Sequence, residues 1–338
     1  MITQGFTQGQ PLRIVSNLDL LKSLQEAPHD IQLKVHSLHG GFVRRSVGIL
    51  KMYASSFGHA AIFLNCPSGE LATLCLLKWI IPFNRAFVIV ADLILPKPSN
   101  IIERVKSYIW KILFHQVALF VLHQRDFTGY QEYFGIQEDR TTYVPFKVNA
   151  IEHLNKIKVE EGDYIFTGGV SSRDYETLAA AISELDYKVV VLTPSPAHAR
   201  SLEKFRFGKN VHVAIDDGSS ESWVNYIANS MFVVLPIDPE VLSPAGVSTY
   251  LVAMALRKCV VVTDGPATRG TLDKTNAVLV APKDPVSLRK ALQRVYCNPE
   301  FRAKISEGGY QYAMSCGGTA RLHRDLLGCL RKYLKENH

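Results

Sequence analysis

The sequence predicts two doubly wound α/β domains, each a parallel sheet with helices packed on it, and three observations carry this prediction. The chain has 338 residues, which suits two domains at roughly 100–200 residues per domain. Short apolar runs rich in β-branched residues alternate with longer helical patterns along most of the chain. These runs are continuous rather than alternating in polarity, as expected for parallel strands buried on both faces.

The predicted strands form two series. The first lies at 12–16, 32–36, 61–64, 86–90, 117–122 and 142–145, and the second at 164–166, 188–192, 211–214, 232–235, 259–262 and 277–280. Helices are predicted between them, for example at 174–184 and 248–257, so the connections are right-handed crossovers. A polar, charged stretch at 148–162 separates the series. We therefore predict domains over 1–150 and 151–338, leaving open that the last helix packs back on the first domain.

Composition narrows the classes of protein that fit. Hydrophobic residues make up 47% and charged residues 20% of the chain, which predicts a packed core and excludes a disordered chain. The net charge of +7 favours an anionic partner. Most of this excess is local, because residues 34–111 hold 10 basic and 3 acidic residues. No nucleic-acid recognition motif accompanies the charge, so a nucleic-acid partner is not expected.

The cysteines and the apolar stretches indicate a cytoplasmic protein. No two of the six cysteines are spaced for zinc, and Cys66, Cys75 and Cys259 lie in apolar runs, which predicts buried thiols in a reducing compartment. The first residues are polar and predict no signal peptide. The longest apolar stretches are interrupted by Lys78 and Asp92 and are too short to span a bilayer. The inner face of the membrane remains the alternative location, with the protein attached peripherally.

Two loops of the second domain are suited to bind a phosphate. Ligands of open α/β sheets bind where strands end and helices begin, because the first helical amides attract anions. The first loop places two glycines and two hydroxyls between a strand and a helix, and its arginine suits phosphate oxygens. Its candidate donor-binding residues are Gly168, Gly169, Ser171, Ser172 and Arg173. The alternative is an ordinary strand-to-helix turn in which Ser172 caps the helix.

The second loop, at 235–250, is punctuated by prolines and leads into a helix whose opening turn is small and rich in hydroxyls. Its candidate donor-binding residues are Glu240, Ala245, Gly246, Val247, Ser248 and Thr249. The alternative interpretation is good capping, with Ser243 as the N-cap and Pro244 at the start of the helix. Two such turns in one domain suit a diphosphate better than either does alone.

The residues after this loop resemble a known family. Residues 251–264 read LVAMALRKCVVVTD, which is similar to the donor-domain signature of GT-B glycosyltransferases of the family 4 type. Residues 281–288 and 298–302 resemble the closing region of that domain, and the turn at 167–169 resembles its first loop, with Arg173 near the position of a phosphate-binding lysine. The resemblance covers about 164–310 and is only architectural for 1–150. It implies the GT-B fold, in which two Rossmann-like domains face a central cleft.

One departure from this family concerns its paired glutamates, spaced E-x7-E. Pro244 and Val252 stand at those positions in this chain, and the second glutamate of the family usually holds the nucleotide ribose. Glu240 is a candidate substitute for one of them. Either the chain is a divergent branch, or it is a catalytically degenerate scaffold or regulatory subunit of a glycan-synthesis complex.

Candidate acceptor-binding and catalytic residues of the first domain lie next to its predicted strands. Asp92 follows the strand at 86–90, where a carboxylate orients an acceptor hydroxyl or acts as general base, although a capping aspartate fits equally well. His123 follows the strand at 117–122. Lys147 follows the last strand and is a candidate to neutralise the donor diphosphate. Gly40, Gly41 and Arg44 form a basic, glycine-hinged loop, for which a surface loop is the alternative.

The stretch 104–114 is predicted to be an amphipathic helix with basic and aromatic residues. We favour a helix whose apolar side packs on the core and whose basic side is solvated. The alternative is a helix that lies on an anionic membrane and approaches a lipid-linked acceptor.

The resemblance implies a function in polysaccharide or glycoconjugate synthesis. It implies transfer of a sugar from a nucleotide-diphosphate donor, UDP- or GDP-linked by preference, to a hydroxyl of a glycan or lipid-linked acceptor. No cofactor is expected. The resemblance implies that no metal is needed, because GT-B enzymes generally work without one, and the lack of an Asp-x-Asp motif agrees. The implied stereochemistry is retention, with Arg173 as a catalytic residue and Asp92 as a positioning group. Asp92 is the candidate base if the reaction inverts.

Overall fold

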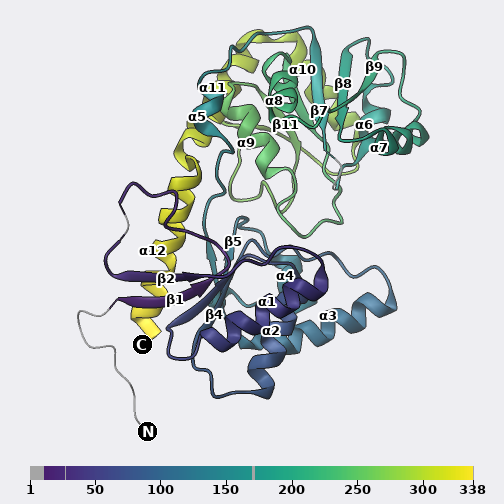
Figure 1. Ribbon diagram of the computed structural model, residues 1–338. Helices are drawn as coiled ribbons and strands as arrows, with labels where there is room; N and C mark the ends of the chain where they lie inside the picture. Colours follow the sequence, from purple (N-terminus) through teal and green to yellow (C-terminus); the bar gives the residue numbers. More distant parts are fainter. Residues whose placement is uncertain (1–10, 27, 170–171, 338) are drawn as a thin grey trace. The chain divides into compact units, whose positions relative to one another are not determined.

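The computed structural model describes residues 11–26, 28–169 and 172–337, which form two compact units (Figure 1). Unit 1 comprises Met1–His123, Phe127–Val144 and Ala320–His338, and unit 2 comprises Gln124–Asp126 and Pro145–Thr319. Each unit holds one six-stranded sheet in which every recorded strand pairing is parallel. The predicted fold class is therefore confirmed.

In unit 1, the sheet has the strand order β2-β1-β3-β4-β5-β6. Its strands are β1 (Leu12–Ser16), β2 (Ile31–Val35), β3 (Ala61–Leu64), β4 (Phe87–Ala91), β5 (Val117–Leu122) and β6 (Thr141–Tyr143). The connecting helices are α1 (Phe42–Ser55), α2 (Ser68–Ile80), α3 (Ile101–Leu113) and α4 (Thr128–Phe134), with 3₁₀ turns at Phe114–Gln116 and Glu138–Arg140.

The four helices of unit 1 cover one face of its sheet. From β2 onward every connection moves in the same direction across the sheet, and right-handed crossovers then place α1 to α4 on the same side. The other face is covered by the last helix, α12 (Thr319–Asn337) (Figure 1). Its leucines pack on alternate residues of the strands, such as Ile14 and Ile89. The core of unit 1 therefore depends on residues from both ends of the chain.

Unit 2 has the strand order β12-β11-β10-β7-β8-β9. Its strands are β7 (Tyr164–Gly168), β8 (Lys188–Thr193), β9 (Val211–Ile215), β10 (Phe232–Leu235), β11 (Val260–Thr263) and β12 (Val278–Val280). Its helices are α5 (Ile151–Leu154), α6 (Tyr175–Ile182), α7 (Pro196–Leu202), α8 (Ser220–Ala228), α9 (Val247–Ala255), α10 (Pro285–Cys297) and α11 (Pro299–Cys316), with a 3₁₀ turn at Glu203–Phe205. Two apolar clusters, one on each face of this sheet, form its core.

All twelve predicted strands are confirmed, with ends that differ by a residue or two. The chain passes from unit 1 to unit 2 between Val144 and Pro145, a few residues before the predicted boundary. The prediction of buried thiols is also confirmed, and burial raises the pKa of both Cys75 and Cys259 to about 12. No helix within the described residues is long and apolar enough to cross a membrane.

The packing of α12 gives a prediction about stability. Leu330 is fully buried against the sheet of unit 1, so Leu330→Ala should lower the free energy of unfolding by about 3 kcal/mol. The control is Gly328→Ala in the same helix, where the added methyl meets open space and should instead stabilise by up to about 1 kcal/mol. Urea unfolding of the full chain measures both values. Equal effects of the two substitutions would show that α12 does not complete this core.

Candidate functional site

The first predicted phosphate loop is a strained turn held by side chains that follow it. Gly168 ends β7, and Gly169 has a φ of +105°. The Nε of Arg173 donates to the Gly168 carbonyl (2.9 Å), and the Tyr175 hydroxyl donates to the Gly169 carbonyl (2.7 Å). Ser171, another predicted donor ligand, lies outside the described residues. The turn is therefore fixed in one conformation by Arg173 and Tyr175.

Glycine is required at both positions of this turn. A Cβ on Gly168 would lie 2.6 Å from Cη2 of Trp223, and a Cβ on Gly169 would lie 2.8 Å from Nη2 of Arg173. The first distance leaves no room for a larger residue beside the partly buried indole ring. The second shows that the guanidinium lies directly against the backbone of the turn.

The structure brings the two predicted loops of unit 2 together. Strand β7 pairs with β10, so the loops that follow these strands start side by side. Arg173 forms an antiparallel bridge with Ile237, and the Asp238 amide donates to the Ser172 carbonyl (3.0 Å). A Cβ on Gly246 would lie 3.9 Å from Nη1 of Arg173. The Arg173 guanidinium therefore lies between the first turn and the start of α9.

Helix α9 begins later than the capping pattern predicts. Gly246, with a φ of +83°, precedes the first helical residue, so the prediction of Ser243 as N-cap and Pro244 at the helix start is wrong. The Tyr250 amide donates to the Gly246 carbonyl (3.0 Å) and closes the first helical turn. The amides of Ser248 and Thr249 have no acceptor within the helix, whereas the Val247 amide lies 3.5 Å from the Pro244 carbonyl. Gly246 also has no side chain that could cap them.

Of the two predicted hydroxyl residues at the start of α9, only Ser248 is exposed. Val247 and Thr249 are buried, whereas Ser248 is exposed and Ala245 is half-buried. A bound anion would therefore meet the Ser248 hydroxyl and the backbone amides, which carry the positive end of the helix dipole.

The other helix start is already capped. Asp174 accepts from the Thr177 amide (3.1 Å), and Lys283 Nζ lies 3.3 Å from the same carboxylate. The ordinary-turn interpretation, in which Ser172 caps α6, is therefore wrong. Ser172 has a φ of +61° and belongs to the turn before the helix. This carboxylate occupies the end of α6, so α9 offers the better anion site of the two helices.

Electrostatics single out the surroundings of Arg173. Burial lowers the pKa of its guanidinium, an effect that the neighbouring Tyr175 opposes, and burial raises the pKa of Tyr175 to about 12. An arginine remains protonated over the physiological range. Unit 2 therefore holds a largely desolvated cation beside the positive end of α9. An anion between the two would interact favourably with both.

The remaining donor-domain candidates lie as follows. Glu240 is exposed on the second loop, where its amide donates to Asp238 Oδ1 (3.0 Å). Lys147 donates to Thr319 Oγ1 (2.9 Å) at the start of α12. Val252, which stands at the position of the family's second glutamate, is buried in the core of unit 2. The roles of Glu240 and Lys147 in donor binding stay predictions.

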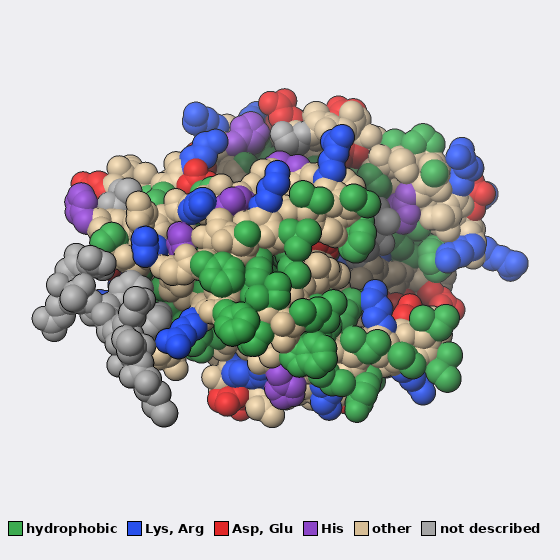
Figure 2. Space-filling model, turned by 60° about the horizontal axis from the view of Figure 1, so that its bottom comes forward, with side chains coloured by type: hydrophobic (Ala, Val, Ile, Leu, Met, Phe, Trp, Pro, Cys, Tyr) green, Lys and Arg blue, Asp and Glu red, His purple; other side chains and the backbone are tan. Residues whose placement is uncertain are grey.

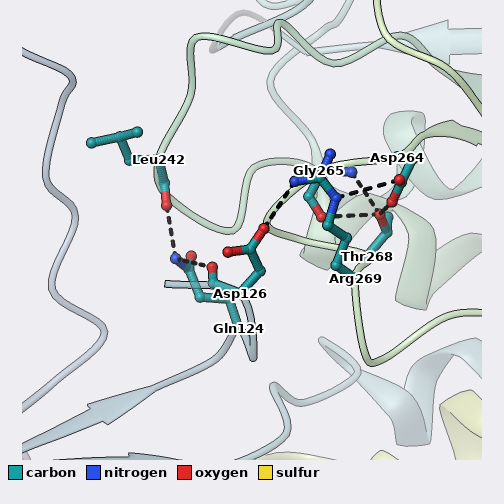
Figure 3. Close-up of polar contacts among 7 residues, drawn as sticks. All are labelled: Gln124, Asp126, Leu242, Asp264, Gly265, Thr268 and Arg269. Atoms are coloured by element: carbon teal, nitrogen blue, oxygen red, sulfur yellow. Dashed lines mark hydrogen bonds and ion pairs between the residues drawn. The ribbon is translucent and has the colours of Figure 1, made fainter. Parts of the chain in front are cut away.

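A polar network that the sequence does not predict fixes the loops after β10 and β11 (Figure 3). Gln124 donates to the Leu242 carbonyl (2.7 Å), and Asp126 lies 3.0 Å from Arg269 Nη1. Arg269 also contacts Asp264, which accepts from Thr268 (3.2 Å). The segment Gln124–Asp126 thus holds both loops from one side, although it is far from them in sequence.

In unit 1, polar residues gather at the carboxyl ends of four adjacent strands. Asn17, Asn65, Asp92 and His123 follow β1, β3, β4 and β5, respectively. The Asn17 side chain donates to the Asn65 carbonyl (2.6 Å) and accepts from its amide (2.8 Å). The Asn65 side chain donates to the Asp92 carboxylate. The two predicted residues, Asp92 and His123, therefore lie together in one cluster.

The two asparagines of this cluster were not predicted from the sequence. The signal that pointed to Asp92, a polar residue directly after a predicted buried strand, applies equally to Asn17 and Asn65. Applied to every strand of the sheet, it would have found both.

The backbone conformation and the pKa of Asp92 both depart from ordinary values, and its catalytic role stays a prediction. Its φ is +53°, an unusual value for an aspartate at a strand end. Burial raises its pKa, while His123 and the Asn65 hydrogen bond oppose the shift. The nearly buried His123 places Nδ1 2.8 Å from the Val144 carbonyl, which can only accept, so that nitrogen carries a proton.

The glycine-hinged loop of unit 1 leads into α1. Gly41 precedes the helix, and Gly40 has a φ of +97°. Arg45, which the sequence places in this basic loop beside Arg44, donates to the Gly40 carbonyl (2.9 Å) and forms an ion pair with the buried Glu70. Arg44 is exposed. The acceptor role of Gly40, Gly41 and Arg44 stays a prediction.

The same two-unit fold occurs in solved glycosyltransferase structures. Sucrose-phosphate synthase from Thermosynechococcus elongatus matches 93% of this chain and 86% of its own, with 13% identity and a TM-score of 0.66. Anabaena HepE in complex with UDP-glucose matches 95% of this chain and 99% of its own, with 12% identity and a TM-score of 0.66.

A third match extends this comparison. The α,α-trehalose 6-phosphate synthase from Burkholderia multivorans matches 97% of this chain and 98% of its own, with 11% identity and a TM-score of 0.63. No protein-family model and no curated protein matches the sequence. The fold is therefore that of GT-B glycosyltransferases, at identities that show the fold alone.

The positive φ and the partial burial of Asp92 give a prediction about stability. Because the folded pKa is raised, the ionised carboxylate costs stability at neutral pH, and this cost disappears as pH falls toward the ordinary value of 3.8. An asparagine side chain carries no charge, and asparagine tolerates a positive φ. Asp92→Asn should therefore raise the free energy of unfolding by about 1 kcal/mol at neutral pH and by less in acid.

Urea unfolding at several pH values measures this gain. The control is Asp217→Asn, because Asp217 is exposed and its pKa is lowered by hydrogen bonds to Ser219. That substitution should stabilise at no pH. A loss of stability in Asp92→Asn at neutral pH would show that the carboxylate has a structural role.

Proposed function

We propose that the chain is a glycosyltransferase that uses a nucleotide-diphosphate sugar, with UDP and GDP as the favoured nucleotides. In this proposal the diphosphate binds in unit 2, between the Arg173 guanidinium and the start of α9. The observation that carries it is the placement of a largely buried arginine beside a helix that begins at Gly246. The GT-B fold and the solved complex of HepE with UDP-glucose support the same assignment.

The chemistry follows from the charge that develops during transfer. As the glycosidic bond to the donor breaks, negative charge accumulates on the leaving diphosphate. A fixed guanidinium and the amides at the end of α9 stabilise that charge without rearranging, because their orientation is set before the substrate binds. Arg173 is held by the Gly168 carbonyl, so it requires no new ordering at that moment. The proposed mechanism needs no metal ion and retains the anomeric configuration.

Asp92 is proposed to act on the acceptor, a hydroxyl of a glycan or of a lipid-linked sugar in polysaccharide or glycoconjugate synthesis. Its carboxylate accepts a hydrogen bond from Asn65 and lies near His123. These neighbours favour the charged form, which can accept a hydrogen bond from an acceptor hydroxyl. Under retention Asp92 positions that hydroxyl, and under inversion it would remove the proton.

A second function is a catalytically degenerate scaffold of a glycan-synthesis complex. Pro244 and the buried Val252 stand where the family has its paired glutamates, so the usual contact to the ribose is missing. Donor binding separates the two functions, because such a scaffold need not bind a nucleotide sugar.

The proposed donor site gives a prediction about Arg173. Arg173→Ala should weaken binding of the preferred nucleotide sugar by about tenfold or more and lower kcat by about a hundredfold, since it removes the fixed cation beside the diphosphate. The control is Arg200→Ala, an exposed arginine of α7 in the same unit. Calorimetry with UDP-, GDP-, ADP- and dTDP-sugars measures binding. Failure of the wild-type chain to bind any of them would contradict the proposal.

The proposed role of Asp92 gives a prediction about the rate of turnover and its pH profile. Asp92→Asn should lower kcat by about a hundredfold while donor affinity is kept. Asn65→Ala removes a hydrogen bond that lowers the pKa of Asp92, so the acid limb of kcat/KM should move to higher pH. Release of the nucleotide diphosphate measures the rate. A uniform loss without a shifted limb would indicate that Asn65 has a structural role only.

A further inference from the structure

The outer side of the helices of unit 1 is apolar. All but three of the large hydrophobic side chains exposed in the described residues belong to this unit. Figure 2 shows hydrophobic side chains gathered on the face that carries these helices, with lysines and arginines around them. Isolated exposed apolar residues are common in proteins, but a contiguous patch marks a surface that is covered in use.

Helix α3 provides the clearest part of this patch. Its exposed apolar residues recur at helical spacing and form one stripe: Ile101, Ile102, Val105, Tyr108, Ile109 and Ile112. Its buried residues are Ser107 and Trp110 on the opposite side. The apolar side of the helix therefore faces solvent, and the expectation that this side packs on the core is wrong. The basic residues are exposed, as expected.

The neighbouring helix extends the apolar surface. Helix α2 contacts both α1 and α3, and the right-handed crossovers place all three on one face of the sheet. At the end of α2, Trp79 and Ile80 are 66% and 62% exposed, and Phe83 just after it is 81% exposed. We refer to the exposed apolar residues of α3 together with Trp79, Ile80 and Phe83 as the apolar face.

The charges beside the apolar face identify its partner. At 100° per residue, the exposed Arg104 and Lys111 flank the α3 stripe on one side, and Lys106 flanks it on the other. Residues 34–111, all of which are described, hold 10 basic residues and only three acids. Glu70 is buried in an ion pair and Asp92 belongs to the polar cluster, which leaves Glu103. An apolar stripe between cations is complementary to an anionic lipid surface.

We propose that unit 1 docks on an anionic phospholipid bilayer through the apolar face. Apolar side chains of α3 enter the boundary between headgroups and acyl chains, and Arg104, Lys106 and Lys111 contact the lipid phosphates. Trp79 and Tyr108 suit this depth, because their rings are apolar with one polar group. This inference goes beyond sugar transfer and does not depend on it.

Flotation of the full chain with vesicles tests the proposal. The chain should float with vesicles of phosphatidylcholine and phosphatidylglycerol, and weakly with phosphatidylcholine alone. Ile102→Glu and Trp79→Ser should each reduce the bound fraction by about tenfold, because each removes a large apolar contact. Arg104→Glu should weaken binding to anionic vesicles and reduce its dependence on salt.

Matched controls lie in unit 2. Val286 is 53% exposed and Arg200 is exposed, so Val286→Glu and Arg200→Glu change a similar side chain away from the apolar face and should bind vesicles like the wild type. Ile102→Glu should also keep its affinity for the nucleotide sugar, which tests the proposed function separately. Circular dichroism checks that every variant is folded.

Two results would overturn the proposal. One is the absence of flotation with anionic vesicles, or equal flotation of wild type and Ile102→Glu. The other is concentration-dependent self-association in ultracentrifugation that Ile102→Glu abolishes while no vesicle binds. That second result would assign the apolar face to an interface between two copies of the chain.

Discussion

The candidate donor site depends on one side chain, Arg173, held against the backbone of two glycine turns. Its Nε donates to the Gly168 carbonyl, and its guanidinium lies beside Gly169 and near Gly246. This arrangement requires glycine where a Cβ would enter the space of the guanidinium or of Trp223. It also requires β7 and β10 to be adjacent strands, because Arg173 and Gly246 lie in the loops that follow them. The local sequence therefore supplies the glycines and Arg173, and the strand order brings the two loops together.

Both units place their candidate site residues at the carboxyl ends of parallel strands, but the groups differ between the units. Unit 2 presents backbone amides and a cation, which suit a ligand rich in negative oxygens. Unit 1 presents the side chains of Asn17, Asn65, Asp92 and His123, which suit a ligand with hydroxyl groups. A donor with a diphosphate and an acceptor with a hydroxyl match this division. The fold supplies the edges of the sheets, and the residues after each strand decide which substrate an edge can hold.

The sequence predicts the strands well, because continuous apolar runs are a direct consequence of burial on both faces. It predicts the details of the turns less well. Ser172 and Ser243 both fit the pattern of an N-cap. However, Asp174 caps α6 and Gly246 precedes α9, because tertiary contacts determine which local alternative forms. The network around Gln124 and Arg269 joins residues distant in sequence, so no local pattern reveals it. Asn17 and Asn65 were within reach, since the rule that points to Asp92 applies to them equally.

Helix α3 shows what amphipathicity does and does not determine. A helical repeat separates an apolar stripe from the remaining residues, but it does not state which side meets the sheet. In globular proteins the apolar stripe is normally buried, and that expectation fails here because Ser107 and Trp110 face inward instead. The other face of the same sheet follows the usual rule, since the leucines of α12 are buried on it. Unit 1 thus has one face completed by its own chain and one whose helices expose an apolar stripe flanked by cations. Helix α12 buries its apolar residues in the usual way. The exposed apolar stripe of α3 on the other face of the same sheet therefore argues for a partner outside the chain.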